Sequence, residues 1–407
     1  MQIVFFALRN FNRARTRTWI TVGAMAFACA IMIFYASLLE GWLAGMEKNA
    51  VGMDLGEFQI HGRGYRADPD LYKIITEEGG VLAQLDRQGF VAAPRLHASG
   101  LAAAGNASSG IELRGVDLVR EGLVTALNQH VWQGQWLAEN DQAGVVVGRK
   151  LARILGLAVG DEVVVVAQAA DGSTANELFR VRGILKSVSE GVDRSGFLMT
   201  AATFRRLMIV PQGVQQIVVK RQVPSENLDQ ATSRLSRLLP NYEVRNWRQL
   251  QPVLARLFEM SDISLVIMLL ITYAAVGILT LNALLMSVFE RIPEFGVMKA
   301  LGFSPWGLFA MIVVESMLQV TVAVVLAVAV GLPLSFYFSH HPIDFSGFVQ
   351  SSSTIAGIAF DPKWYCVVTV NSVVLPILFL YLVAGLAILY PALKAAMLKP
   401  LAAIYHR

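Results

Sequence analysis

Four long apolar runs dominate this 407-residue chain and limit the folds that it can adopt. They cover residues 19–39, 263–289, 306–338 and 364–390. Each is about 20 residues or longer, which is the length that an α-helix needs to cross the hydrocarbon of a bilayer. The mean hydropathy of the chain is +0.52, well into the apolar range. We therefore predict an α-helical membrane protein with four transmembrane helices.

Basic residues mark the side of the membrane on which each connecting segment lies. Residues 1–18 contain four arginines and no acid, and further basic residues lie in 290–305 and in the tail, 391–407. Since Arg and Lys are enriched in cytoplasmic segments, both termini and residues 290–305 are predicted to be cytoplasmic, and 339–363 to be an outer loop. The first apolar run is too long for a signal peptide and is predicted to be an uncleaved span.

Residues 40–262 have a mixed, turn-rich composition that differs from the apolar runs. Strand-like and helix-like stretches alternate here, which predicts a large extracytoplasmic α+β domain inserted between the first and second spans. Its flanks, 40–55 and 245–262, are predicted to be helical. The predicted strands are Phe58–His61, Gly110–Gly115, Glu162–Ala167, Leu178–Ile184 and Gln215–Lys220, and the predicted helices are Leu71–Gln88, Arg149–Leu155 and Ser225–Leu239.

A short charged segment, 290–305, interrupts the apolar sequence between the second and third spans. Pro293 suits the first turn of a helix, and Gly302 suits the position just past its end. Helical spacing would place Pro293, Val297, Ala300 and Leu301 on one apolar edge, with Glu290, Arg291, Glu294 and Lys299 on the other. A short amphipathic helix at the membrane surface and an ordinary polar loop both remain open.

No motif in the chain indicates catalysis, metal binding or nucleic-acid binding. The nearest approach to a phosphate loop is Gly144–Leu151, where the glycines are too close together and Leu151 replaces the hydroxyl that would hold magnesium. The six histidines show no metal-ligand spacing. A net charge of +4 gives no basic nucleic-acid face. We predict a non-catalytic chain with no cofactor of its own.

Glu315 is an acid placed well inside the third apolar run. A carboxylate at the centre of a span costs about 2.5–3.5 kcal/mol on insertion scales, which the surrounding apolar residues can offset. It is either a polar contact to another helix that moves during a working cycle, or a residue near the inner interface that snorkels to the membrane surface or pairs with an arginine.

The order of one span, a large outer domain and three further spans resembles the FtsX/MacB-type permeases of ABC transporters. Local matches support this resemblance. Segment Glu290-Arg291-x-Pro293-Glu294-Phe295-Gly296-x-x-Lys299-Ala300-Leu301-Gly302 is similar to the family's coupling segment. Segments Ala7–Thr21, Val147–Asp161, Phe179–Ile184 and Tyr390–Pro400 are similar to further family patterns, those of the outer domain being closest to the lipoprotein-releasing LolC/LolE kind. Between Ala167 and Phe179 this chain has only a short turn, where lipoprotein-releasing relatives carry a long loop.

The resemblance implies a permease subunit in a bacterial inner membrane with its large domain in the periplasm. Its expected partners are a cytoplasmic ATPase dimer, which would bind ATP and Mg, a second copy or paralogue of the permease, and the lipid bilayer. Residues 290–302 would dock on the ATPase, and the outer domain would handle a hydrophobic envelope substrate such as a lipid or lipoprotein. The alternative is a mechanotransmitting relay that activates a periplasmic partner, such as a cell-wall hydrolase, without transport.

Four residues on the second span are candidates for a surface that faces a lipid-like substrate: Leu265, Met268, Leu269 and Thr272. Plain contact with lipid or with another helix is the competing interpretation for each.

Overall fold

The computed structural model of the chain describes residues 15–223, 226–345, 354–355, 358–359 and 362–397. It has two compact units. The helical unit comprises Met1–Ala44, Phe258–Phe345 and Lys363–Arg407, and the α+β unit comprises Gly45–Leu257 and Ser346–Pro362. Most of the predicted basic start and the end of the predicted tail lie outside the described residues.

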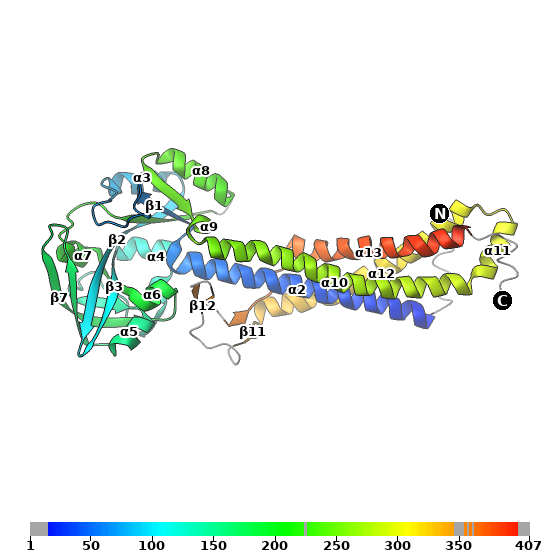
Figure 1. Cartoon of the computed structure of the whole chain (residues 1–407), viewed down its shortest axis with the longest axis horizontal. Helices are drawn as coiled ribbons and strands as arrows, with labels where there is room; N and C mark the ends of the chain where they lie inside the picture. Colours follow the sequence, from blue (N-terminus) through cyan, green and yellow to red (C-terminus); the bar gives the residue numbers. More distant parts are fainter. Residues whose placement is uncertain (1–14, 224–225, 346–353, 356–357, 360–361, 398–407) are drawn as a thin grey trace. The chain divides into compact units, whose positions relative to one another are not determined.

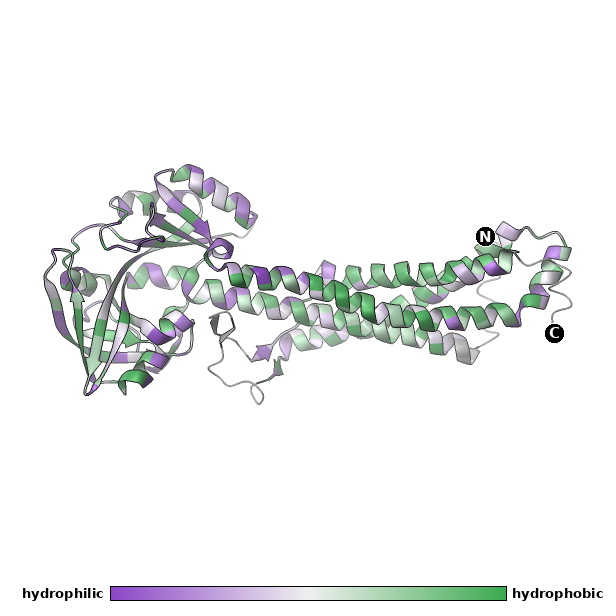
Figure 2. Cartoon of the chain, in the orientation of Figure 1, coloured by the Kyte–Doolittle hydropathy of each residue, from purple (hydrophilic) through white to green (hydrophobic). Residues whose placement is uncertain are grey.

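Four long helices carry the apolar runs: α2 (Arg15–Ala50), α10 (Pro252–Glu290), α12 (Pro305–His340) and α13 (Val370–Met397) (Figure 1). In the described part of the chain these four are long and apolar enough to cross a membrane. Hydrophobic residues dominate much of their length in Figure 2. A short π-helix, η1 (Val51–Leu55), follows α2 directly. The predicted fold class, four apolar helices with an inserted α+β domain, is confirmed.

The fourth long helix, α13, begins and ends later in the chain than the predicted fourth span, 364–390. Two-residue strands β11 (Ile343–Asp344) and β14 (Lys363–Trp364) pair before α13, so the helix begins only at Val370. Its C-terminal end lies at Met397, beyond the predicted end at residue 390. The helix continues because Ala392 and Ala395 are fully buried against neighbouring helices.

Small residues allow helices of the helical unit to approach closely. Ala323, Ala327 and Gly331 recur at every fourth position along α12, and both alanines are fully buried. A Cβ added at Gly331 would lie 3.2 Å from the Cα atom of Ala30 on α2. Close backbone approach of this kind is how apolar helices gain packing energy in lipid, where the hydrophobic effect gives little.

The α+β unit is built on one large sheet with the strand order β10-β1-β9-β2-β3-β8-β5-β7-β4. Strand β6 lies off this path and pairs with both β2 and β7. Pairs β3–β8 and β5–β7 are parallel, and the others are antiparallel. The strands are β1 (Phe58–Gly62), β2 (Phe90–Ala104), β3 (Ala107–Val116), β4 (Val131–Gly134), β5 (Gly144–Val147), β6 (Glu162–Gln168), β7 (Thr174–Leu185), β8 (Gly196–Thr200), β9 (Gln216–Arg221) and β10 (Tyr242–Asn246). Two further short strands, β12 (Thr354–Ile355) and β13 (Ile358–Ala359), pair with each other.

Short helices connect these strands, and polar side chains cap several of them. Asp117, Ser189, Thr200 and Asn227 each accept backbone N–H groups at a helix start. The helices are α3 (Glu78–Arg87), α4 (Leu118–Val124), η2 (Leu127–Gln129), α5 (Arg149–Leu155), α6 (Glu190–Ser195), α7 (Ala201–Met208), α8 (Leu228–Leu238) and α9 (Trp247–Leu250).

Two predicted helices of this unit are shorter in the structure. The prediction of a helix over Leu71–Gln88 holds only from Glu78 to Arg87, because Ile75 instead forms an isolated antiparallel bridge with Val214. The prediction over Ser225–Leu239 is replaced by α8, which begins after its Asn227 cap. Residue 225 lies outside the described residues.

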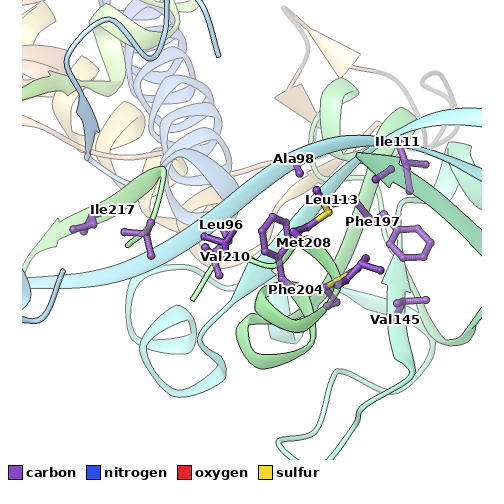
Figure 3. Close-up of a cluster of buried hydrophobic side chains, with 14 of the residues drawn as sticks. Leu96, Ala98, Ile111, Leu113, Val145, Phe197, Phe204, Met208, Val210 and Ile217 are labelled. Atoms are coloured by element: carbon purple, nitrogen blue, oxygen red, sulfur yellow. The ribbon is translucent and has the colours of Figure 1, made fainter. Parts of the chain in front are cut away.

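Apolar side chains from the sheet and from α7 form the main core of this unit. Figure 3 shows Phe204 and Met208 of α7 beside Leu96 and Leu113, which come from β2 and β3. The alternation of buried and exposed residues along β6 shows that only one of its faces contributes to this core. The sheet holds the strands that carry the polar residues described below.

Candidate functional site

The predicted coupling segment forms a short helix, α11 (Ile292–Ala300), between α10 and α12. Pro293 stands in its first turn, where a missing N–H group costs no helical hydrogen bond. Gly302 follows its end with a φ of 94°, which glycine adopts without strain. The segment is therefore a helix and not a polar loop, and it is shorter than the predicted range 290–305.

The buried face of α11 differs from the predicted apolar edge. Ile292, Phe295 and Gly296 are its buried residues. Phe295 packs in one cluster with Leu308 of α12 and Ile388 of α13. This aromatic side chain buries more apolar surface than any other in the helix, so it fixes which face of α11 turns inward.

The predicted edge itself points outward. The exposed fraction is 50% for Val297 and 84% for Leu301, and Pro293 and Ala300 are also exposed. Trp306, in the first turn of α12, is 73% exposed. The end of α11 and the start of α12 thus leave large apolar side chains uncovered by this chain.

The charged residues of α11 are tied to neighbouring helices. Arg291 donates from Nη1 to both carboxylate oxygens of Glu315 on α12, at 3.0 and 3.2 Å. Its Nε atom also lies 3.5 Å from a carboxylate oxygen of Glu294. Lys299 donates to the carbonyl oxygen of Ala396 near the end of α13. Both cations therefore link α11 to the long helices.

The structure places Glu315 in an ion pair with Arg291. This contact is compatible with both interpretations of the sequence, so the role of Glu315 stays a prediction. Its side chain is 13% exposed, so the carboxylate is largely shielded by protein. The pair joins the start of α11 to the third apolar helix. Of the predicted coupling residues, Glu290, Pro293, Ala300, Leu301 and Gly302 are exposed, Arg291, Glu294 and Lys299 are half-buried, and Phe295 and Gly296 are buried.

The four candidate substrate-facing residues of α10 do not share an accessible surface. Leu269 is fully buried, and Leu265 packs against the same helical cluster. Thr272 is half-buried, and only Met268 is largely exposed, at 41%. The buried stripe of α10 continues to Tyr273. Helical spacing puts Leu265 and Leu269 on the side that packs in the bundle, which agrees with the competing interpretation of helix contact for these two residues. A substrate-facing role of the four residues stays a prediction.

A charged network in the α+β unit was missed by the sequence reading. Arg95 on β2 makes two hydrogen bonds to Glu121 of α4, at 2.5 and 3.0 Å, and both side chains are 1% exposed. Arg95 also contacts Asp54 of η1, which pairs with Arg114 on β3. Arg114 in turn lies 3.4 Å from Glu112 on the same strand.

The pKa shifts show that the network is held in its charged form. Arg114 lowers the pKa of Glu112 strongly, more than burial raises it. Burial alone would raise the pKa of Glu121, but the Arg95 guanidinium and its hydrogen bonds outweigh that effect and lower it. Attraction between the paired charges and their hydrogen bonds offset the cost of desolvating them, so removing one partner would leave a costly unpaired charge.

Hydrogen bonds of histidine and glutamine side chains extend the network across the sheet. His97 Nδ1 lies 2.8 Å from Glu112, and its Nε2 lies 2.9 Å from the side-chain oxygen of Gln216 on β9. The amide nitrogen of Gln216 lies 3.2 Å from His61 Nε2 on β1. One sequence signal could have found these residues: Arg95 with His97, and Glu112 with Arg114, stand two apart in strands and so share a face.

Comparison with known proteins identifies the family of the chain. Residues 18–238, more than half of the chain, match the family described as the MacB-like periplasmic core domain. Residues 266–400 match the family described as the FtsX-like permease C-terminal region. The chain belongs to the FtsX/MacB-type permeases of ABC transporters.

Individual relatives are distant. The chain is 22% identical over 273 residues to the lipoprotein-releasing system transmembrane protein LolC of Xylella fastidiosa, covering 64% of each chain. It is 23% identical over 193 residues to an uncharacterised ABC transporter permease of Methanocaldococcus jannaschii, covering 45% of this chain and 46% of that one. The periplasmic region of MacB from Actinobacillus actinomycetemcomitans is 15% identical, with a TM-score of 0.36 over 51% of this chain and 95% of that one.

As an FtsX/MacB-type permease, the chain is a multi-pass membrane protein with a periplasmic-type domain between its first two long helices. Permeases of this family are not catalytic, and an ABC permease implies a partner ATPase. Membership of this family does not by itself assign a role to α11 or to the periplasmic-type domain.

Proposed function

We propose that this permease couples ATP hydrolysis by a separate cytoplasmic ATPase to movement of its periplasmic domain, which handles a hydrophobic envelope substrate such as a lipid or lipoprotein. In this proposal the chain lies in a bacterial inner membrane with both termini cytoplasmic, and it works beside a second permease copy or paralogue. ATP and Mg bind the ATPase, and this chain supplies no cofactor site.

The outward apolar face of α11 is the observation that supports this assignment. Leu301 is 84% exposed and Val297 is 50% exposed on a helix whose other face is anchored by Phe295. An apolar patch anchored on rigid helices is typical of a protein–protein interface. Because Arg291 and Lys299 make hydrogen bonds from α11 to α12 and α13, a displacement of α11 would be transmitted to both helices.

The docking step is tested with two substitutions at one exposed position. We expect Leu301→Glu to weaken association of the co-expressed ATPase with the permease by about tenfold or more, as burying an unpaired carboxylate at an interface would. Leu301→Met keeps an apolar side chain and should retain the ATPase. Both are measured by binding of the purified ATPase to the permease in nanodiscs.

Equal ATPase binding by wild type and both variants would overturn the assignment of α11 as the docking helix. The substrate is a separate question. Co-purification from the native membrane should bring lipid or lipoprotein together with the ATPase. An outer hydrolase without enriched lipid would instead support the relay mechanism.

A further inference from the structure

The α+β unit contains an open cleft of about 1220 Å³ that no part of the proposed function uses. It lies where strand β2 changes partners. Strand β9 pairs with β2 as far as Arg95, and β6 takes over at Gly100. His97, Ser99 and Gly100 of β2 line the cleft at this break in the sheet. A cleft of this size holds a ligand of two to three sugar rings or a short peptide.

The acids and arginines that line the cleft are equal in number, and those of its floor are paired within the protein, whereas Arg66 and Asp70 lie at its edge outside this network. The carboxylate of Asp54 faces two guanidinium groups, those of Arg95 and Arg114, and Glu112 faces Arg114 and His97. A charged ligand would have to compete with these contacts, and it would lose its own hydration without gaining a free counter-ion. The paired charges of the floor therefore offer no free counter-ion to a charged ligand.

One buried polar atom beside this floor lacks a partner. His61 lines the cleft and is 3% exposed, and its Nδ1 atom makes no hydrogen bond within the described residues. The ring of Tyr65 stacks on the His61 ring at 5.4 Å between centroids. The Nδ1 atom has almost no accessible surface, so a ligand in the cleft would contact the more exposed side chains of the lining and not this nitrogen.

Apart from Arg66 and Asp70, the rest of the lining consists of uncharged groups. Amide and hydroxyl side chains, which donate and accept hydrogen bonds, surround the cleft together with two tyrosine rings. They are Gln59, Tyr65, Tyr72, Ser99, Gln168 and Gln251.

From this arrangement we propose that the cleft between β9 and β6 is a binding site for a neutral, hydroxyl-rich ligand of saccharide chemistry. Hydroxyl groups match side chains that both donate and accept, and sugar rings offer apolar faces to Tyr65 and Tyr72. Asp54, which closes the floor, lies four residues beyond the end of α2, Ala50. A ligand in the cleft would therefore contact the network that holds η1, whether or not the chain handles a lipid.

The test uses the full chain in nanodiscs made from lipids without sugar headgroups. Three neutral trisaccharides (maltotriose, cellotriose and triacetylchitotriose) are titrated by calorimetry, with glucose 6-phosphate and spermidine as charged probes. We expect at least one neutral trisaccharide to bind and neither charged probe to do so.

Matched variants locate the binding. Ser99→Trp fills the cleft from an exposed position and should weaken trisaccharide binding by about tenfold or more, which corresponds to about one missing anchoring contact. Ser108→Trp, at an exposed position on the adjoining strand β3 outside the cleft lining, should leave binding within about twofold of wild type. If Ser99→Trp fails to fold, Gln168→Trp at the end of β6 makes the same test.

Three outcomes would overturn the proposal: no neutral probe binds, a charged probe binds in preference, or the cleft-filling variant binds as well as wild type. None of these results depends on the ATPase. A failure here would leave the docking role of α11 standing, and a failure of the Leu301 test would leave this site standing.

Discussion

Arg291 shows how burial decides the value of an ion pair at the scale of single residues. The same guanidinium contacts Glu315, whose side chain is 13% exposed, and Glu294, whose side chain is 41% exposed. The pair with Glu315 is made at 3.0 Å with little water around it, whereas the contact with Glu294 is longer and more solvated. The two carboxylates therefore serve as an internal comparison.

We predict that Glu315→Gln lowers the free energy of unfolding of the permease by about 1–3 kcal/mol, the range for losing a shielded hydrogen bond to a charged group. Glu294→Gln should cost less than about 1 kcal/mol, as exposed pairs do. Chemical unfolding in mixed micelles measures both. An equal loss of unfolding free energy in the two variants would contradict a larger contribution from the shielded pair with Glu315.

His61 predicts a pH dependence of the α+β unit. Burial, followed by the nearby charges of His97, Arg66 and Arg245, lowers its pKa from an ordinary 6.5 to about 3. Between these values the unfolded chain binds a proton that the folded chain does not. The free energy of unfolding should therefore fall as the pH falls below 6.5, by up to about 1.4 kcal/mol per pH unit.

Hydrogen exchange in peptides of β1 and β9, corrected for intrinsic rates, measures this local stability at pH 7 and pH 5. The dependence should flatten in His61→Gln and persist in His130→Gln, which changes a half-buried histidine elsewhere in the unit. A slope that is unchanged in His61→Gln would assign the effect to another group.

At the scale of the element, Gly41 of α2 allows a close approach between two segments of the helical unit. Gly41 and Gly45 lie four residues apart in the C-terminal part of α2. A Cβ added at Gly41 would lie 1.7 Å from the carbonyl oxygen of Tyr365, whereas one added at Gly45 meets nothing within 4 Å. Gly41 therefore lets the segment before α13 pack on α2, and Val367 N–H donates there to the Ser37 carbonyl at 2.9 Å.

We predict opposite effects for the two alanine substitutions. Gly41→Ala should destabilise the helical unit by about 1–3 kcal/mol, the usual cost of overpacking. Gly45→Ala should stabilise α2 by about 0.5–1 kcal/mol, because alanine is the better helix former where space is free. Thermal unfolding of the two variants in the same detergent compares them, and a stable Gly41→Ala protein would contradict the close approach.

At the scale of the whole molecule, the family implies an ATPase partner, and we propose two permease chains in the complex. Native mass spectrometry from nanodiscs should give two permease and two ATPase chains for wild type. Leu301→Glu should lose the ATPase and keep the permease pair, because its change lies at the turn between α10 and α12. A single permease chain in both samples would contradict the proposed pair.

The amino-acid sequence by itself determined the four apolar helices and the inserted α+β domain, and it left open whether residues 290–305 form a short helix or a polar loop. Hydrophobic run length and helical punctuation are local properties, so they can be read without knowing what packs against what. Tertiary structure alone decided that Phe295 turns inward and Leu301 outward, that Leu269 is buried in the bundle, and that Glu315 meets Arg291. It also brought His61, His97, Glu112 and Arg114 to one cleft, because strand order and register, which join residues far apart in the chain, are set by packing of the whole sheet.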